Sequence, residues 1–449
     1  MTNASGARPP LASILPTSAR ASDDGHLQIG GCDLVTLAAE YGTPLYIYDE
    51  TTIRDICREY RHEFQGRLPQ LRVLYAGKAY LSPALAAILA QEEMGLDIVS
   101  GGELHIARAG GFPPERMAFH GNNKSEAELG EALDAGLGRI MIDNDHELDL
   151  LERLVAQRGG KPSVMLRVTP GVDAETHVKT TTGLRDSKFG FPLDSGDAER
   201  AVERMLAADA LDLTGFHIHL GSPIYKTEPY VDGIDVMTRF AADMRDRHDY
   251  TWREFSPGGG FAVGYTPDGL PPSIATYAET VANALHAACE RHGLPLPEVH
   301  IEPGRSIVAR AGVALYRVGS RKEIPGLRTY VALDGGMADN IRPAMYGSAY
   351  TALLANRVHD AAEETVTLAG RFCESGDVLV KDVALPRTQP GDLVAIPSSG
   401  AYNLAMESNY NLAQRPAVVF VQDGVARLTR RRQTYDDLLA LDVLPEGSS

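Results

Sequence analysis

Glu302 and Arg305 are the residues whose placement first points to chemistry. They flank Pro303 and Gly304, directly after the apolar run 299–301, which predicts a short buried strand that ends in a turn. A carboxylate and a guanidinium at one strand end suit a ligand with a ring nitrogen to be kept protonated and an anionic group to be bound. A structural ion pair at the strand end would explain the same two residues.

Lys78 ends a second apolar stretch, residues 73–77. A lysine at a buried strand end is costly unless it is paired or covalently used. Desolvation would lower its pKa, as a Schiff-base lysine requires. The alternative is a surface lysine whose ammonium group reaches solvent.

His217 and His219 lie two residues apart and therefore on one face of a strand predicted over 213–219. Such a pair can be a metal site. Because no cluster of further histidine and aspartate ligands accompanies the pair, we expect no bound metal. A flat imidazole can equally stack on a planar cofactor.

The triplet Gly258-Gly259-Gly260 follows a strand predicted over 253–256. Its amides can surround an anion, and the hydroxyl of Ser222 adds to such a phosphate site. A glycine triplet alone is weak evidence. It gains weight here because a lysine, a histidine and an arginine end other predicted strands.

These residues must be positioned by an alternation of short apolar segments with segments of helical periodicity, such as 81–93, 125–135 and 274–292. Eight strands are predicted at 73–78, 96–100, 117–120, 139–143, 164–168, 213–219, 253–256 and 299–302. The pattern is typical of a (β/α)8 TIM barrel, an α/β fold whose active site lies at the carboxyl ends of the strands. A doubly wound open sheet is the alternative, but no GxGxxG motif follows the first strand.

From about residue 314 the segments become mostly strand-like, which predicts a second, mainly β domain with a sandwich-like or barrel-like form. We expect a strand near Leu27 to join it. The predicted boundaries are a disordered tail over 1–24, an N-terminal segment of the β domain over 25–46, the barrel over 47–312 and the C-terminal β domain over 313–449.

Composition narrows the class of protein. The net charge of −17 over 449 residues argues against nucleic-acid or anionic-membrane partners. The four cysteines fit no metal spacing or disulfide framework, which favours a reducing cytoplasm. No apolar run reaches the roughly 20 residues of a membrane span.

Taken together, the motifs resemble those of the fold-type III pyridoxal-phosphate decarboxylases with an alanine racemase-like barrel, and most closely the diaminopimelate decarboxylases. The barrel motifs are YAGKA at 75–79, SGGEL at 100–104, HGNNKS at 120–125, SKFG at 187–190, HIHLGS at 217–222, PGGGF at 257–261 and EPGR at 302–305. The later motifs are DGGM at 334–337, RPAMYG at 342–347, CESGD at 373–377, GAY at 400–402 and SNYN at 408–411. Tyr80 and Pro223 depart from the usual pattern at the edges of the pocket.

The resemblance implies a site for pyridoxal 5'-phosphate. Lys78 would attach the cofactor, His219 would stack on its ring, and Glu302 would pair with the ring nitrogen. The phosphate would be bound by Ser222, Gly258, Gly259, Gly260 and Tyr402, next to Pro303, Gly304 and Arg305. Arg305, Arg342, Tyr346 and Tyr402 would bind the substrate's distal carboxylate end, and Glu374 its distal ammonium.

The implied reaction is decarboxylation of meso-diaminopimelate to L-lysine, with Cys373 as proton donor and with Cys373 and Glu374 supplied by the partner chain of a homodimer. A related decarboxylase for ornithine, arginine or a carrier-bound amino acid would share the cofactor site. A non-catalytic pyridoxal-phosphate protein would lack the second domain. A metal-dependent hydrolase is the remaining class of enzyme.

Overall fold

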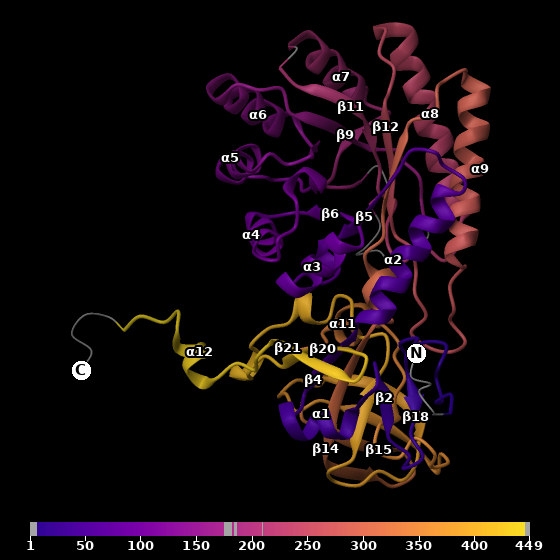
Figure 1. Ribbon diagram of the computed structural model, residues 1–449, viewed down its shortest axis with the longest axis vertical. Coiled ribbons are helices and arrows are strands. Elements are labelled where there is room, and N and C mark those ends of the chain that lie inside the picture. The colour runs from indigo at the N-terminus through magenta and orange to yellow at the C-terminus, as the bar shows by residue number, and fades with distance from the viewer. Residues whose placement is uncertain (1–6, 175–181, 184–185, 209, 445–449) are drawn as a thin grey trace. The chain divides into compact units, whose positions relative to one another are not determined.

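The computed structural model describes residues 7–174, 182–183, 186–208 and 210–444, which belong to two compact units (Figure 1). The barrel unit comprises the described parts of residues 54–263 and 271–307. The β unit comprises those of 1–53, 264–270 and 308–449. The boundaries predicted at 47 and 312 therefore fall within the β unit, because the strands that contain these residues pair with its sheet.

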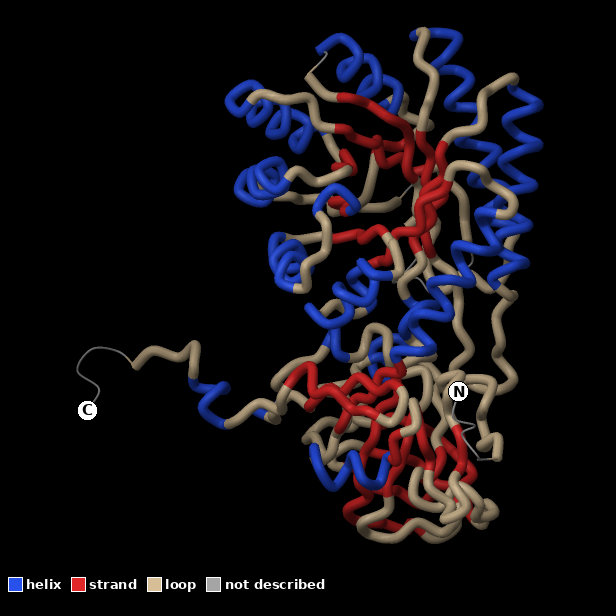
Figure 2. Tube along the Cα trace, viewed as in Figure 1, coloured by secondary structure: helices blue, strands red, loops and turns tan. Residues whose placement is uncertain are grey.

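The barrel unit is built on a parallel sheet that closes on itself. Its strands are β5 (Leu71–Ala76), β6 (Gly95–Ile98), β7 (Met117–Phe119), β8 (Arg139–Ile142), β9 (Ser163–Thr169), β11 (Asp212–His217), β12 (Glu254–Gly259) and β13 (Glu298–Glu302). They are ordered β9-β11-β12-β13-β5-β6-β7-β8, and β8 pairs again with β9. The short β10 (Phe191–Pro192) pairs in parallel with the end of β9. All the predicted barrel strands are present, and the (β/α)8 fold is confirmed (Figure 2).

Helices follow the strands in the connections. They are α2 (Glu50–Gln65), α3 (Pro83–Gln91), α4 (Gly101–Ala109), α5 (Glu126–Ala135), α6 (Asp145–Arg158), α7 (Asp197–Ala208), α8 (Glu228–His248), α9 (Ile274–His292) and α10 (Arg305–Val308), with 3-10 turns η1 (Gly77–Ala79) and η2 (Pro114–Arg116). Short polar side chains begin several of them, as expected for N-caps. Ser125 and Glu128, for example, form a reciprocal capping box at α5.

The barrel interior is closed by a small apolar layer. Leu74, Ala118, Met141 and Met165 form a buried cluster in which no member is more than 4% exposed. These residues lie on β5, β7, β8 and β9. Polar side chains at the carboxyl ends of the strands and polar side chains at the amino ends therefore belong to two separate regions of the same barrel.

The β unit combines strands from both ends of the chain. Its main sheet contains β4 (Leu45–Asp49), β14 (Gly312–Ile324), β15 (Arg328–Leu333), β16 (Leu353–Leu354), β17 (Glu364–Ala369), β18 (Val378–Leu385), β19 (Leu393–Ile396), β20 (Ala417–Gln422) and β21 (Val425–Arg430). β4 pairs antiparallel with β14 and parallel with β20, so the N-terminal strand of the main sheet is β4. The strand predicted near Leu27 belongs to this unit but pairs within a separate three-stranded sheet. The sequence did not predict the long strand β14.

Smaller elements complete the β unit. They are β1 (Arg20–Ala21), β2 (Leu27–Ile29), β3 (Cys32–Asp33), α1 (Leu34–Tyr41), α11 (Arg342–Tyr346), α12 (Tyr435–Leu439), η3 (Leu404–Met406) and η4 (Tyr410–Leu412). The hydrophobic core draws on strands from both ends of the chain, including Leu27, Ile47, Val313 and Val419.

The N-terminal segment differs from its prediction. Ile14 and Leu15 are at most 1% exposed, and β1 pairs with β2. A loose tail is therefore wrong for residues 7–24, and the rest of the predicted tail lies outside the described residues. The scarcity of regular periodicity here reflects turns rather than disorder. Across the described chain, no helix has both the length and the apolarity needed to cross a membrane.

Candidate active site

Lys78 lies at the carboxyl end of the barrel, on the turn η1 that follows β5. Close packing shapes this turn, because a Cβ added to Gly77 would lie 2.8 Å from the carbonyl oxygen of Asp97. The side chain of Lys78 is exposed. The predicted desolvation of its ammonium group is therefore not found in this structure, and its reactivity must depend on its neighbours at the barrel mouth.

The glycine triplet at the end of β12 is required by geometry. Gly258 and Gly260 have φ angles of +80° and +100°, which disfavour other residues. A Cβ on Gly259 would lie 2.1 Å from the carbonyl oxygen of Glu302, and one on Gly260 would lie 2.4 Å from that of Gly221. The triplet thus forms a concave loop that any side chain would fill.

The amides of this loop are not all available to an anion, although the sequence suggested that they would be. Gly258 donates its N–H to Ser256 Oγ at 3.1 Å, and Gly259 donates to His219 Nδ1 at 3.3 Å. The first two glycines therefore serve mainly to let the backbone pass close to its neighbours. Gly260 remains the member best suited to contact a phosphate.

Arg305 lies beside Ser222, the hydroxyl predicted to join the phosphate site. Its Nε and NH2 atoms are 3.4 and 3.3 Å from Ser222 Oγ, and the side chain is buried at the start of α10. A guanidinium next to this loop suits a phosphate group, which accepts several hydrogen bonds from a planar fork of donors.

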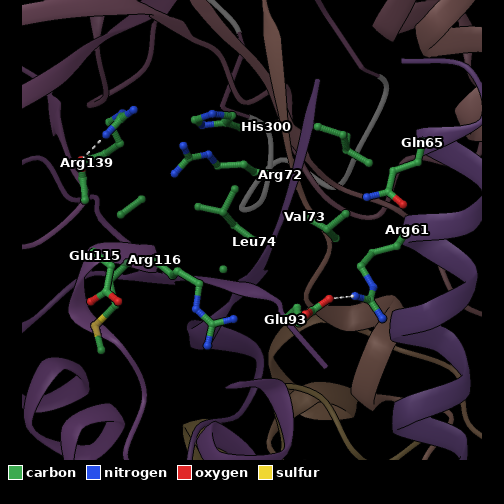
Figure 3. Close-up of a pocket in the computed structure, with 15 residues that line it drawn as sticks. Arg61, Gln65, Arg72, Val73, Leu74, Glu93, Glu115, Arg116, Arg139 and His300 are labelled. Atoms are coloured by element: carbon green, nitrogen blue, oxygen red, sulfur yellow. Dashed lines mark hydrogen bonds and ion pairs between the residues drawn. The ribbon is translucent and has the colours of Figure 1, made fainter. Parts of the chain in front are cut away.

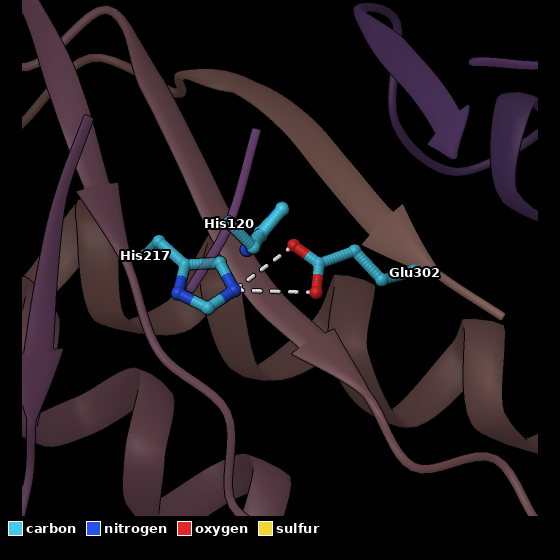
Figure 4. Close-up of side chains that lie close together, drawn as sticks. All are labelled: His120, His217 and Glu302. Carbon is cyan, nitrogen blue, oxygen red and sulfur yellow. Dashed lines mark hydrogen bonds and ion pairs between the residues drawn. The ribbon is translucent and has the colours of Figure 1, made fainter. Parts of the chain in front are cut away.

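Glu302 is the buried carboxylate at the centre of the barrel mouth. Ser256 Oγ donates to its Oε1 at 2.6 Å, and His217 Nε2 lies 3.0 Å from Oε1 and 3.2 Å from Oε2 (Figure 4). Burial alone would raise the pKa of Glu302. The electrostatic interactions with His217 and His120 and the hydrogen bonds from His217 and Ser256 more than offset burial and hold that pKa well below its ordinary value.

His120 completes this group of side chains. Its ring packs edge-on against that of His217, with centroids 5.0 Å apart. The ligand atoms of His120, His217 and Glu302 lie within 4.8 Å of one another, which is compatible with a metal ion. However, both oxygens of Glu302 already face the Nε2 donor of His217, and Oε1 also accepts from Ser256. The arrangement is that of a hydrogen-bonded carboxylate.

His219 lies at the mouth of the barrel, half-buried, and its Nδ1 accepts the N–H of Gly259. Burial, followed by the charge of Lys78, lowers the pKa of His219 well below its ordinary value. The ring is therefore neutral and can stack on an aromatic ligand without a charge penalty. The two histidines of the HIH motif thus have different surroundings.

In the β unit, Arg342 is a buried cation that contacts two tyrosines. Its guanidinium donates to Tyr350 Oη and lies 4.5 Å from the ring centre of Tyr265. Within the described residues, no carboxylate lies at ion-pair distance from Arg342. A buried guanidinium that contacts only neutral groups is a natural binding site for a carboxylate ligand.

Other predicted residues of the β unit lie on turns. Tyr346 ends α11, and Tyr402 has a φ angle of +60°, an uncommon conformation for a residue with a side chain. Cys373 and Glu374 are exposed on the turn between β17 and β18. The structure does not show these four residues acting together.

Asp377 explains two of the sequence motifs. Its carboxylate accepts the N–H groups of Met337 and Phe372, which ties the DGGM segment to the turn that carries Cys373. A Cβ on Gly336 or Gly370 would lie within 2.5 Å of the Asp377 carboxylate. These glycines are needed because the buried aspartate occupies the adjacent space.

Ser256 and His120 were not predicted as functional residues. Ser256 precedes the glycine triplet by two residues, so strand alternation could have placed it on the same face as Gly258. His120 opens the HGNNKS motif at a predicted strand end. Their relation to Glu302 depends on the closure of the barrel, which no local pattern reveals.

The amino end of the barrel contains a cavity of about 360 Å³ (Figure 3). Its lining includes Arg61, Arg72, Arg116, Arg139 and His300. Three of these arginines face acidic partners: Arg61 pairs with Glu93, Arg72 with Glu298 and Arg139 with Glu254. The charge of this cavity is thus largely balanced from within the protein.

The carboxyl end of the barrel fits pyridoxal phosphate. A glycine loop with no room for side chains adjoins a serine and an arginine, which suits a phosphate. A buried ionised carboxylate suits a protonated ring nitrogen, a neutral imidazole suits the ring face, and an accessible lysine suits an aldehyde. Fold and site together define a pyridoxal-phosphate enzyme of the barrel class.

Comparisons with known proteins narrow this class. Residues 51–309 match the family of the pyridoxal-dependent decarboxylases, pyridoxal binding domain. The chain is 46% identical over 430 residues to diaminopimelate decarboxylase of Bacillus subtilis, covering 96% of this chain and 98% of the relative. It is 44% identical over 445 residues to the diaminopimelate decarboxylase of Synechocystis, covering 97% and 94%.

A solved structure gives the same result. The diaminopimelate decarboxylase of M. jannaschii in complex with L-lysine matches with a TM-score of 0.89 and 32% identity, over 95% of this chain and 98% of that one. This chain therefore belongs to the diaminopimelate decarboxylase family of pyridoxal-dependent decarboxylases.

Proposed function

We propose that the chain removes carbon dioxide from meso-diaminopimelate and releases L-lysine, the last step of bacterial lysine biosynthesis, with pyridoxal 5'-phosphate as cofactor. The observation that carries the proposal is the ionised Glu302, buried at the barrel mouth beside a glycine loop too tight for side chains. Relatives at up to 46% identity over nearly the whole chain bear the name of this activity.

Pyridoxal phosphate supplies an aromatic ring that accepts electrons from the bond broken in decarboxylation. In our proposal Lys78 attaches the cofactor through its amine, and His219 supports the face of the ring. Glu302 holds a proton on the ring nitrogen, and the Pro303-Gly304 turn lets the backbone leave the strand at that point. A Cβ on Gly304 would lie 2.9 Å from that of Ala76, so the turn packs directly against the end of β5.

The phosphate group would be held by Ser222, Gly260 and Tyr402, with Gly258 and Gly259 allowing close approach. Arg305 also belongs here in our proposal, because its guanidinium lies beside Ser222. This revises its role from a ligand of the distal substrate carboxylate toward a ligand of the phosphate. The change follows from the contact itself.

The distal carboxylate of the substrate would then be bound mainly by Arg342, with Tyr346 and Tyr402 as further contacts and Glu374 for the distal ammonium. The absence of an acidic partner for Arg342 among the described residues supports this assignment. Ornithine and lysine have no distal carboxylate, so neither would pair with Arg342. Discrimination against ornithine of about 100-fold or more is expected.

Cys373 is the proposed proton donor to the substrate carbon that loses its carboxylate. A thiol can be tuned to donate near neutral pH by a polar site. Its exposure on a turn supports a role at a surface that meets another molecule. We therefore propose a homodimer in which Cys373 and Glu374 serve the partner's site.

Subunit mixing tests the dimer directly. Inactive Lys78→Ala protein mixed with inactive Cys373→Ala protein would form hybrids with one intact site in two, which gives roughly a quarter of wild-type activity at equal mixing. Lack of recovery after demonstrated subunit exchange would place each site within a single chain.

The activity is tested with purified protein, first by its absorbance spectrum and then by lysine release from meso-diaminopimelate. Ornithine, arginine and a carrier-bound amino acid are the comparison substrates. Faster turnover of any of these would transfer the chain to a related decarboxylase. A lysine/ornithine decarboxylase of Vibrio vulnificus shares the fold at 23% identity, a level that shows the fold alone.

We also propose a cytoplasmic location. The four cysteines form no disulfide, as expected for a reducing compartment. Cell fractionation tests this proposal.

A further inference from the structure

The carboxylate of Glu302 is hydrogen-bonded to His217, a residue with no role in the proposed reaction. His217 lies on β11 and Glu302 ends β13, 85 residues later in the chain. The His217 side chain is 1% exposed, so water does not compete for this contact. A carboxylate oxygen beside Nε2 requires that this nitrogen carry the proton.

A second donor approaches the same carboxylate from β12. Gly258 donates its N–H to Ser256 Oγ, and Ser256 donates in turn to Glu302 Oε1. The glycine loop and the carboxylate are therefore linked by hydrogen bonds that all point toward Glu302. Such a chain strengthens each of its members.

Among the described residues, His217 is the one titratable group that donates a hydrogen bond to Glu302. Burial lowers the pKa of His120 well below its ordinary value, so this ring is neutral. Burial, followed by the negative charge of Glu302, raises the pKa of Asp97 well above its ordinary value. The titratable groups that interact with Glu302 from the surrounding strand ends are Asp97, His120, Arg167, His217 and His219, and Lys78 acts on Asp97 and His219.

His217 Nδ1 is buried without a hydrogen bond among the described residues, whereas His120 Nε2, which also makes none, lies 3.4 Å from Asp97 Oδ1. Unpaired buried polar atoms are costly, and a folded protein retains them where a function requires the group. The cost of the unpaired Nδ1 is explained if the imidazole of His217 is needed for the hydrogen bond from its Nε2 to Glu302.

We propose that His217 is a positioning residue that keeps Glu302 ionised and fixes the direction of its carboxylate, so that the proton shared with the cofactor's ring nitrogen stays on the ring. The inference rests on the proposed role of Glu302 and adds a residue to it. Donation from His217 makes the carboxylate a weaker base. Without that donor, burial would favour a protonated Glu302, and a protonated carboxyl cannot stabilise a pyridinium.

The test measures binding to the apoenzyme, not turnover. Two probes are compared: pyridoxal phosphate and its carbon analogue 1-deazapyridoxal phosphate, in which the ring nitrogen is replaced by CH. Wild-type protein should bind the natural cofactor more tightly, because only it pairs with Glu302. His217→Phe keeps a flat ring and removes the donor, and it should reduce this preference about tenfold.

Two controls separate the role from a general loss of structure. His217→Gln, which can place an amide N–H near the position of Nε2, should restore most of the preference. His217→Leu provides a second donor-free variant if the phenylalanine is not accommodated. The wild-type chromophore should not change through the mildly acidic range, whereas that of His217→Phe should titrate there as Glu302 takes up a proton.

Glu302→Gln separates the proposed role of Glu302 from the proposed role of His217. It should abolish the preference by itself, and His217→Phe added to it should then have no further effect, because the two residues act through one proton. If Glu302→Gln keeps the wild-type preference, the proposed role of Glu302 is wrong. If Glu302→Gln abolishes the preference but His217→Phe retains it, the role of His217 alone is overturned.

Discussion

The two ends of the barrel treat buried polar groups differently. At the amino end, Arg139 Nε donates to Glu254 Oε2 at 2.7 Å, Thr214 also donates to Glu254, and Arg72 and His300 meet Glu298. At the carboxyl end, His217 Nδ1 is buried without a hydrogen bond in the described chain, and Asp97 Oδ1 and His120 Nε2 face each other at 3.4 Å without forming one. Balanced pairs stabilise a fold, whereas unpaired groups are available to a ligand.

A high density of charge does not by itself mark the catalytic end of this barrel. Both ends are rich in charge, and the amino end holds a cavity of about 360 Å³, yet the arginines of that cavity are mostly neutralised. Two atoms break the contrast, since Arg61 Nε and His300 Nδ1, from residues that line this cavity, also lack a hydrogen bond within the described residues. Charge density alone therefore does not identify the site; the pairing of each charge does.

Of the changes at the carboxyl end of the barrel, Lys78→Ala should reduce activity most. Removing the lysine that follows β5 should lower activity at least about 10,000-fold while the fold persists. Wild-type protein should show an absorbance that borohydride bleaches, and the variant should not. A variant that kept a borohydride-reducible chromophore would show that another lysine attaches the cofactor.

Arg139→Met, at the amino end of the barrel, should lower stability and leave activity nearly unchanged, the reverse of the result expected for Lys78→Ala. It leaves the buried carboxylate of Glu254 without its cation and should cost about 3–5 kcal/mol in the free energy of unfolding. Activity per folded, cofactor-loaded molecule should change little. Denaturant unfolding and kinetics on the same sample measure both quantities.

The matched control for that variant is the double change Arg139→Met with Glu254→Leu. With no charge left unpaired, much of the lost stability should return. Loss of activity without loss of stability in Arg139→Met would mean that the two ends are coupled after all.

Glu302→Gln tests the role of the buried carboxylate at the carboxyl end of the barrel. The amide cannot hold the pyridinium proton, so turnover should fall by about 2–4 kcal/mol in barrier height while the cofactor remains bound. Steady-state kinetics and the bound-cofactor ratio are the measurements. Equal turnover in both proteins would remove Glu302 from the reaction.

Glu298→Gln should show the smallest effect. Its hydrogen bond with His300, opposed by partial burial and aided by Arg72, lowers the pKa of Glu298 to about 2. An acid whose pKa is lowered by folding stabilises the folded state at any pH above its ordinary pKa of 4.5. This contribution is lost as the pH falls from 4.5 toward 2. The variant should lose about 1–2 kcal/mol at neutral pH.

That loss should shrink once the pH falls below about 4.5, because wild-type Glu298 then becomes protonated too. Urea unfolding of both proteins across this range measures the difference. A difference that stayed constant with pH would mean that Glu298 stabilises the barrel without its charge.

The sequence by itself determined the barrel, its strands and the family. Short apolar segments that alternate with amphipathic ones report which faces are buried, and this is a property of about ten neighbouring residues. Motifs at strand ends then placed Lys78, His219, Gly260 and Glu302 at one end of the barrel. The turns that bury Ile14 and Leu15 carry no such period, so the N-terminal segment was misjudged.

The tertiary structure alone decided which atoms meet. That His217 faces Glu302, that Ser256 donates to the same carboxylate, and that Arg305 lies beside Ser222 are contacts between residues 46 to 85 positions apart in the chain. Local periodicity places a side chain inside or outside, but the partner on the next strand follows from how the sheet closes. The electrostatics of the site therefore follow from the closed barrel.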